Sequence, residues 1–159
     1  AVPSDRVIEK GDFVLMDYGA GYCDYRSDMT RTVVMGEPTQ EQLDLYALVR
    51  RTHEECVAAI HPGVEGNDIF KLSKKIIGDA GYGDYYNHGL GHGVGIDIHE
   101  LPNFNRSKNT IEIGSVVTME PGVYLPGVGG VRLEDYGVVT ENGYEPFTKT
   151  PHDLHVIDC

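Results

Sequence analysis

The chain has 159 residues, which at roughly 100–200 residues per domain predicts a single domain. Its hydrophobic and charged fractions of 40% and 24% are typical of a soluble globular protein, and its apolar runs are too short for a transmembrane helix. Acidic residues outnumber basic ones by 25 to 13, so nucleic acid and anionic membranes are not expected as partners. The 3 cysteines without a CxxC motif, and the absence of a secretory signal pattern, favour a cytoplasmic protein.

The first third of the chain is expected to form a hairpin followed by a helix. Residues 12–17 are an apolar run that predicts a buried strand, and the β-branched residues 29–35 predict its partner. Thr39 and Gln42 form a capping-box pattern that opens a helix, and apolar residues then follow helical spacing as far as Ile60.

A second, shorter helix is expected next, capped by Asn67 or Asp68 and ended by glycines. Residues 85–99 are rich in glycine and carry three histidines. Three further strands are predicted, over residues 115–120, 131–139 and 144–148.

An internal repeat relates the two ends of the chain. Residues 11–19 match residues 114–122, because both are apolar strands that end in an acid followed by x-Gly. Residues 27–30 and 133–136 also correspond, and each leads into a β-branched strand. The sequence therefore predicts two related hairpins about a pseudo-twofold axis. Two helices precede the second hairpin but not the first, so about 60–100 matching residues are expected upstream, and residues 1–159 are interpreted as one N-terminally truncated catalytic domain.

Four acids occupy matched positions of the repeat, namely Asp17, Asp28, Glu120 and Glu134. Taken alone, Asp17 is typical of a turn cap and Glu134 of a solvated surface residue. Their recurrence favours a shared site, where four converging carboxylates without cations would repel each other. Two divalent ions offset four negative charges, and acids that bridge two metals are common in hydrolytic enzymes.

Three histidines, His88, His92 and His99, are separated by glycines at alternate positions from 89 to 95. These glycines disfavour a helix and allow the backbone to approach another group closely. The histidines are therefore expected to point into a shared cavity, the alternative being a mobile loop with incidental histidines. Imidazole added to carboxylates suits manganese, cobalt or zinc.

Four ordered motifs together resemble the pita-bread metallopeptidases, a family that includes methionine aminopeptidase, aminopeptidase P and prolidase, with creatinase as a metal-free relative. The motifs are MDYGA and SDMTRT within residues 16–32, HGLGHGVGIDIHE at 88–100, TMEPGVY at 118–124 and VRLEDYGVV at 131–139. Their wording is most similar to the Xaa-Pro branch. The resemblance implies an α+β pita-bread fold and a dinuclear-metal exopeptidase that hydrolyses the Xaa-Pro bond at the N-terminus of di- or oligopeptides.

The resemblance also implies roles for individual residues. The metal ligands would be Asp17, Asp28, His92, Glu120 and Glu134, the second and the last of which bridge both ions. Glu120 would also act as general base, and His99 would contact the substrate and stabilise the tetrahedral intermediate. His88 would lie at the substrate pocket and Arg132 would brace the site. The ions would be manganese first, with cobalt or zinc as alternatives.

Two other functions stay open beside the peptidase. One is a non-catalytic pita-bread binding module, and the other is a metal-free amidinohydrolase like creatinase. Retention of all five ligands weighs against both. The expected partner is a peptide with proline at its second position. A homodimer, and the activity of this chain alone, stay open.

Overall fold

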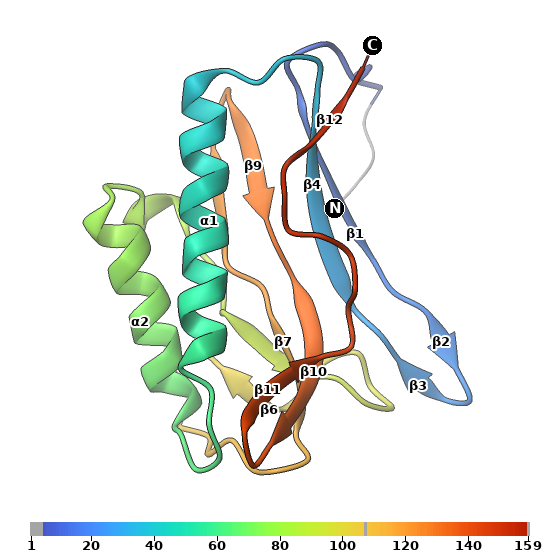
Figure 1. Ribbon diagram of the computed structural model, residues 1–159, viewed down its shortest axis with the longest axis vertical. Coiled ribbons are helices and arrows are strands. Elements are labelled where there is room, and N and C mark those ends of the chain that lie inside the picture. Colours follow the sequence, from blue (N-terminus) through green and yellow to red (C-terminus); the bar gives the residue numbers. More distant parts are fainter. Residues whose placement is uncertain (1–4, 107, 159) are drawn as a thin grey trace.

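The computed structural model describes residues 5–106 and 108–158, in which two α-helices lie beside one another against a set of strands (Figure 1). The helices are α1 (Gln40–Ala58) and α2 (Gly66–Asp79), followed by the 3-10 turn η1 (Gly83–Tyr85). The strands are β1 (Phe13–Tyr18), β2 (Gly21–Tyr22), β3 (Tyr25–Arg26), β4 (Met29–Met35), β5 (Gly91–Gly93), β6 (Glu100–Phe104), β7 (Val116–Met119), β8 (Gly122–Leu125), β9 (Gly129–Arg132), β10 (Asp135–Thr140), β11 (Gly143–Pro146) and β12 (His155–Ile157). Neither α-helix in these residues has the length and apolar character needed to cross a bilayer.

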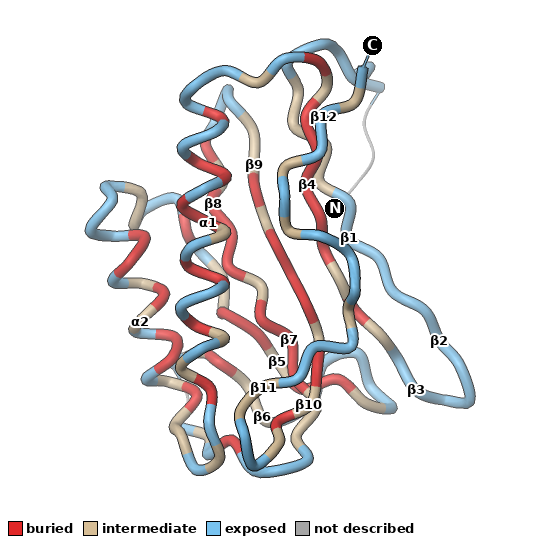
Figure 2. Tube along the Cα trace, in the orientation of Figure 1, coloured by how far each residue is buried: buried red, intermediate tan, exposed pale blue. Residues whose placement is uncertain are grey.

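The predicted first hairpin is present, with β1 and β4 antiparallel and Asp17 opposite Thr30. β4 is largely buried because it lies between β1 and the parallel strand β12 in a three-stranded sheet. The prediction that the first strand is buried is wrong, since β1 is half-buried at its start and exposed from Met16 to Tyr18. The physical reason is its place at the edge of this sheet, where one side has no partner strand among the described residues (Figure 2).

The second hairpin of the repeat is also present, as the antiparallel pair β7 and β10 in a five-stranded sheet of order β11-β10-β7-β5-β6. The single strand predicted over 131–139 is instead two strands. β9 ends at Arg132 and pairs with β8, whereas β10 begins at Asp135 and pairs with β7 and β11. The chain therefore changes partners at Leu133–Glu134, and an antiparallel bridge between Glu134 and Thr30 joins the two hairpins there.

The capping box predicted for the first helix is confirmed, with Thr39 and Gln42 exchanging hydrogen bonds at the start of α1. The predicted cap of the second helix is wrong. α2 begins at Gly66 with Glu65 as its N-cap, so Asn67 and Asp68 lie inside the first turn. The apolar faces of both helices contribute to one core with the strands, which holds the site in place.

The glycine-rich segment after η1 forms a short strand rather than a mobile loop. β5 pairs with β6 on one side and β7 on the other. A side chain at Gly91 would run into the carbonyl oxygen of Thr118, so the predicted close approach of the backbone is confirmed. The hairpin β2–β3 projects from the body and is exposed (Figure 2), and its turn residues Cys23 and Asp24 both have positive φ, as a two-residue hairpin turn requires.

Candidate metal centre

The four acids of the repeat lie at the ends of strands that meet between the two hairpins. Asp17 is near the end of β1 and Asp28 immediately precedes β4. Glu120 immediately follows β7 and Glu134 immediately precedes β10. β5 brings His92 among them, with its Nε2 atom 3.2 Å from Oε1 of Glu120 and 3.8 Å from Oδ2 of Asp28. All five predicted ligands are therefore held by strands or strand ends, which fixes their backbone positions.

A tight group within this set could hold a metal ion. One ligand atom from each of Asp28, His92 and Glu134 lies within 4.8 Å of the others. Burial, followed by the charge of Asp17, raises the pKa of Asp28. Burial, followed by the charge of Glu120, raises the pKa of Glu134. These carboxylates are thus poorly accommodated as bare anions, and a divalent cation with mixed oxygen and nitrogen ligands fits the donor set.

Glu120 and His92 form a separate, complementary pair. Burial favours the neutral form of Glu120, but its hydrogen bond with His92 and the positive charges around it lower its pKa overall. Burial likewise opposes the charged form of His92, yet the hydrogen bond to Glu120 raises its pKa overall. Thr118 also donates a hydrogen bond to Glu120 Oε1 at 3.2 Å. In the metal-free protein Glu120 is therefore ionised and oriented, whereas the raised pKa values of Asp28 and Glu134 favour their protonated forms.

Arg132 links the ligand positions through all three of its nitrogens. It forms an ion pair with Asp17, whose side chain is 49% exposed, and donates from Nη1 to the Tyr124 hydroxyl at 2.9 Å. Its Nε donates to Thr30 Oγ1 at 3.0 Å, and Thr30 in turn donates to Glu134 Oε2 at 2.6 Å. Asp17 thus faces a fixed cation in this structure, and Arg132 reaches both halves of the repeat.

A cavity of about 560 Å³ opens over this network. Its lining residues are Asp17, Asn87, His88, Gly89, Gly91, His92, His99, Glu120, Tyr124 and Arg132. All three predicted histidines contribute to it, as expected for a shared cavity. His99 is exposed and its ring centroid lies 4.3 Å from that of His92.

His88 is oriented by hydrogen bonds on both ring nitrogens. Nδ1 lies 2.7 Å from the carbonyl oxygen of Gly89, so Nδ1 carries the proton and donates to it. Nε2 then accepts from the Tyr124 hydroxyl at 3.0 Å, and Tyr124 accepts from Arg132. Burial lowers the pKa of His88, which agrees with this neutral tautomer. The hydrogen-bonded side chains of Arg132, Tyr124 and His88 therefore form one ordered side of the cavity.

Sequence reasoning missed Tyr124 and Thr30 as members of the site. Each lies within one of the four motifs, Tyr124 at the end of TMEPGVY and Thr30 within SDMTRT. Their positions in the sequence could have indicated this, since Thr30 lies two residues after Asp28 and Tyr124 lies four residues after Glu120. In a strand, side chains an even number of residues apart point to the same face. Without the pairing of strands, a hydroxyl at these positions cannot be told from an ordinary strand residue.

Comparison with known proteins agrees with this geometry. A family model described as metallopeptidase family M24 matches residues 1–141. The Xaa-Pro dipeptidase of Pyrococcus furiosus is 45% identical over 154 residues, which is 96% of this chain and 44% of that protein.

Solved structures of similar chains have the same fold. The prolidase from Pyrococcus horikoshii superposes with a TM-score of 0.92 at 42% identity, over 95% of this chain and 44% of that one. The X-Pro aminopeptidase from Thermotoga maritima superposes with a TM-score of 0.93 at 35% identity, over 97% and 44% of the two chains. The fold is therefore the α+β pita-bread fold, and the chain spans less than half the length of the relatives it matches.

Proposed function

Because the chain belongs to metallopeptidase family M24, we propose that it is the metal-binding part of an exopeptidase that hydrolyses the Xaa-Pro bond at the N-terminus of di- or oligopeptides. The observation that carries the proposal is that His92 belongs to a buried group with Asp28 and Glu134 and pairs with Glu120, while Asp17, His92 and Glu120 line the adjoining cavity, so acids from both halves of the repeat meet there. Relatives named for Xaa-Pro dipeptidase and X-Pro aminopeptidase support the substrate class.

The five converging residues would hold two divalent ions, with manganese as first choice and cobalt or zinc as alternatives. Asp28 and Glu134 would be shared between the ions, which agrees with their burial beside each other. When bound, the ions would supply Lewis acidity toward the scissile carbonyl and lower the pKa of the attacking water.

The chain's own side chains would carry the remaining steps. Glu120, oriented by the Thr118 hydroxyl at 3.2 Å, would accept a proton from the attacking water and pass it toward the leaving nitrogen. His99 lies at the exposed rim beside His92, where it would donate to the oxygen of the scissile carbonyl as charge develops there. His88, held neutral by Gly89 and Tyr124, would line the pocket for the substrate.

The substrate would be a peptide with proline at its second position and a free N-terminus. The cavity is lined by acids as well as by histidines and one arginine, so it suits a zwitterionic peptide better than a polyanion. We extend the proposal to a cytoplasmic protein that needs neither nucleic acid nor a membrane, with a homodimer as the assembly to be tested.

The test is proline release from Xaa-Pro dipeptides by the gene's full-length product after loading with Mn²⁺. We expect turnover of Xaa-Pro, no turnover of the N-acetylated form, and loss of activity to background in Asp28→Asn. The amide keeps the shape of the side chain but removes the charge that a bridging ligand supplies. Bound metal without turnover of any Xaa-Pro peptide would reject the peptidase in favour of a binding module. Absence of both metal and turnover would favour a metal-free relative.

A further inference from the structure

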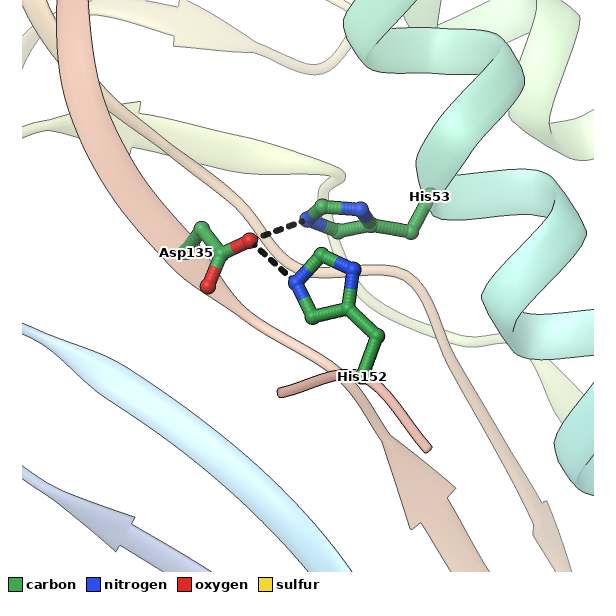
Figure 3. Close-up of side chains that lie close together, drawn as sticks. All are labelled: His53, Asp135 and His152. Atoms are coloured by element: carbon green, nitrogen blue, oxygen red, sulfur yellow. Dashed lines mark hydrogen bonds and ion pairs between the residues drawn. The ribbon is translucent and has the colours of Figure 1, made fainter. Parts of the chain in front are cut away.

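A second cluster of charged and aromatic side chains lies directly behind one proposed bridging ligand. It consists of Asp135 from β10, Arg31 from β4, His53 from α1 and His152 from the segment between β11 and β12. Figure 3 shows the aspartate with the two histidines. Both histidines point toward the Asp135 carboxylate. The side chains of Asp135, Arg31 and His53 are 3–6% exposed, and that of His152 is 26% exposed. We call this set the Asp135 cluster.

The cluster is connected to the metal centre by chain position. Asp135 follows Glu134, and Arg31 follows Thr30, at the bridge that joins the two hairpins. Successive side chains point to opposite faces of extended backbone. Thr30 and Glu134 therefore face the metal centre, whereas Arg31 and Asp135 face the opposite side. Thr30 hydrogen-bonds Glu134 in the metal centre, whereas Arg31 pairs with Asp135 at 2.7 Å in the cluster. The bridge is thus clamped from both faces.

All three nitrogens of the Arg31 guanidinium donate hydrogen bonds in this arrangement. Beyond Asp135, it donates to the carbonyl oxygens of Glu134 at 2.7 Å and Thr30 at 2.9 Å. It also donates to the carbonyl oxygens of Thr150 at 2.8 Å and Pro151 at 3.1 Å, which ties down the segment that carries His152. The backbone of Glu134 is therefore held by the same guanidinium that holds the segment before β12.

His152 completes the clamp on the second carboxylate oxygen. Its Nε2 lies 2.6 Å from Oδ2 of Asp135, the shortest contact that the carboxylate makes. The His53 ring packs edge to face against His152, with centroids 4.9 Å apart. Its Nε2 also lies 3.4 Å from Oδ2 of Asp135 (Figure 3), a longer contact than that of His152 and without hydrogen-bond geometry. His53 therefore supports the His152 ring by packing.

We propose that His152 is a positioning residue for the metal centre: its hydrogen bond fixes Asp135 and thereby the Glu134 backbone, so that Glu134 meets both ions. This inference rests on the proposed function, since it assigns a role toward the same two ions. Residues that orient metal ligands through hydrogen bonds commonly change metal affinity by about 10–100-fold when they are removed.

A third metal ion in the Asp135 cluster is the competing interpretation. Ligand atoms of His53, Asp135 and His152 do lie within 4.8 Å of one another. However, the Arg31 guanidinium already neutralises Asp135 at 2.7 Å, and Asp135 is the one carboxylate of this buried cluster. Adding a dication would leave a large uncompensated positive charge in the interior. The hydrogen-bonded clamp is the arrangement that the charges favour.

The experiment titrates Mn²⁺ into the metal-free, full-length gene product by calorimetry, with folding checked by circular dichroism. His152→Leu keeps similar bulk and removes the donor, so we expect Mn²⁺ affinity to fall by about 10-fold. His152→Gln retains a donor at the same reach and should recover most of that affinity. In the Mn²⁺-saturated enzyme we expect His152→Leu to lower kcat with KM unchanged, because His152 does not line the substrate cavity.

Asp153→Asn is the matched control, because it breaks the ion pair of the same segment with Arg50 without touching Asp135. It should leave Mn²⁺ affinity unchanged, as should His53→Leu. Unchanged Mn²⁺ affinity in His152→Leu, or an equal loss of Mn²⁺ affinity in Asp153→Asn, would overturn this inference and leave the proposed function standing. If the wild type binds a third Mn²⁺ ion that both histidine variants lose, the Asp135 cluster is a metal site and the positioning role is wrong. A wild-type protein that binds no Mn²⁺ would overturn the proposed function and this inference with it.

Discussion

Glu134 shows how one side chain can be costly for the fold and useful for a metal centre. It is 2% exposed, lies beside Asp28 and Glu120, and is compensated by a hydrogen bond from the Thr30 hydroxyl at 2.6 Å and by the charge of Arg132. A buried carboxylate surrounded by other acids destabilises the metal-free protein, because folding favours its protonated form. Binding of a cation removes that cost, so the stability of the protein and its metal content are linked.

This linkage predicts the pH dependence of stability. The pKa of Glu134 is raised in the folded state above its usual value of 4.5, so its contribution to stability is present below pH 4.5 and is lost as the pH rises through the raised value. In chelator, wild type should therefore lose stability relative to Glu134→Gln as the pH rises above 4.5, by up to about 1.4 kcal/mol per pH unit.

Urea unfolding of both proteins at a series of pH values measures this difference. Excess Mn²⁺ is the control, and it should reverse the order so that wild type becomes the more stable protein. A difference between the two proteins that does not change with pH in chelator would show that Glu134 is not held in its protonated form.

The residues of the site were predictable by type and by repetition. Asp17 and Glu120 could be matched because each ends an apolar strand before x-Gly, where a lone charge is out of place. The contacts among them were not predictable. The ion pair of Arg132 with Asp17 and the Tyr124–His88 hydrogen bond depend on strands that are far apart in sequence.

At the scale of elements, β5 positions the site by bringing His92 beside Glu120. Its two glycines allow the strand to run between β6 and β7 at a separation that a side chain would not permit. A Cβ atom at Gly91 would collide with the backbone carbonyl of Thr118, which cannot move without opening the sheet. The glycine pattern is therefore a requirement of the site rather than of a flexible loop.

Gly91→Ala should destabilise the protein by about 1–3 kcal/mol, the usual cost of overpacking, and should weaken Mn²⁺ binding because His92 is displaced with the strand. Gly78→Ala is the matched control. Position 78 lies in α2, where an added Cβ atom would meet nothing within 4 Å, so alanine there should stabilise by about 0.5–1 kcal/mol. Chemical denaturation measures both, and equal effects at the two positions would contradict the role given to β5.

Elements were predictable where one physical signal dominates. β4 and the capping box of α1 were found because β-branching and a reciprocal hydrogen bond are local properties. The division of residues 131–139 into β9 and β10 was not found, because it depends on a change of partner strands that lie elsewhere in the sequence. The exposure of β1 depends on what covers its sheet, which is not a local property either.

At the scale of the whole molecule, the proposed metal centre needs both hairpins of the repeat. Each supplies two acids, and the bridge between Thr30 and Glu134 joins them into one site. Part of the net charge of −12 then has a local explanation, since four of the 25 acidic residues are placed where positive ions are expected. Because the chain spans 44% of the relatives it matches, substrate selectivity is a property to be measured on the full-length gene product.

The number of Mn²⁺ ions bound per chain at saturation tests this account most directly. The full-length gene product is loaded with Mn²⁺, freed of excess ions by gel filtration, and analysed by elemental mass spectrometry against protein concentration. The convergence of four acids and His92 predicts two ions per chain, and fewer in Asp28→Asn. One ion or none in the wild-type protein would contradict a dinuclear centre built from the two halves of the repeat.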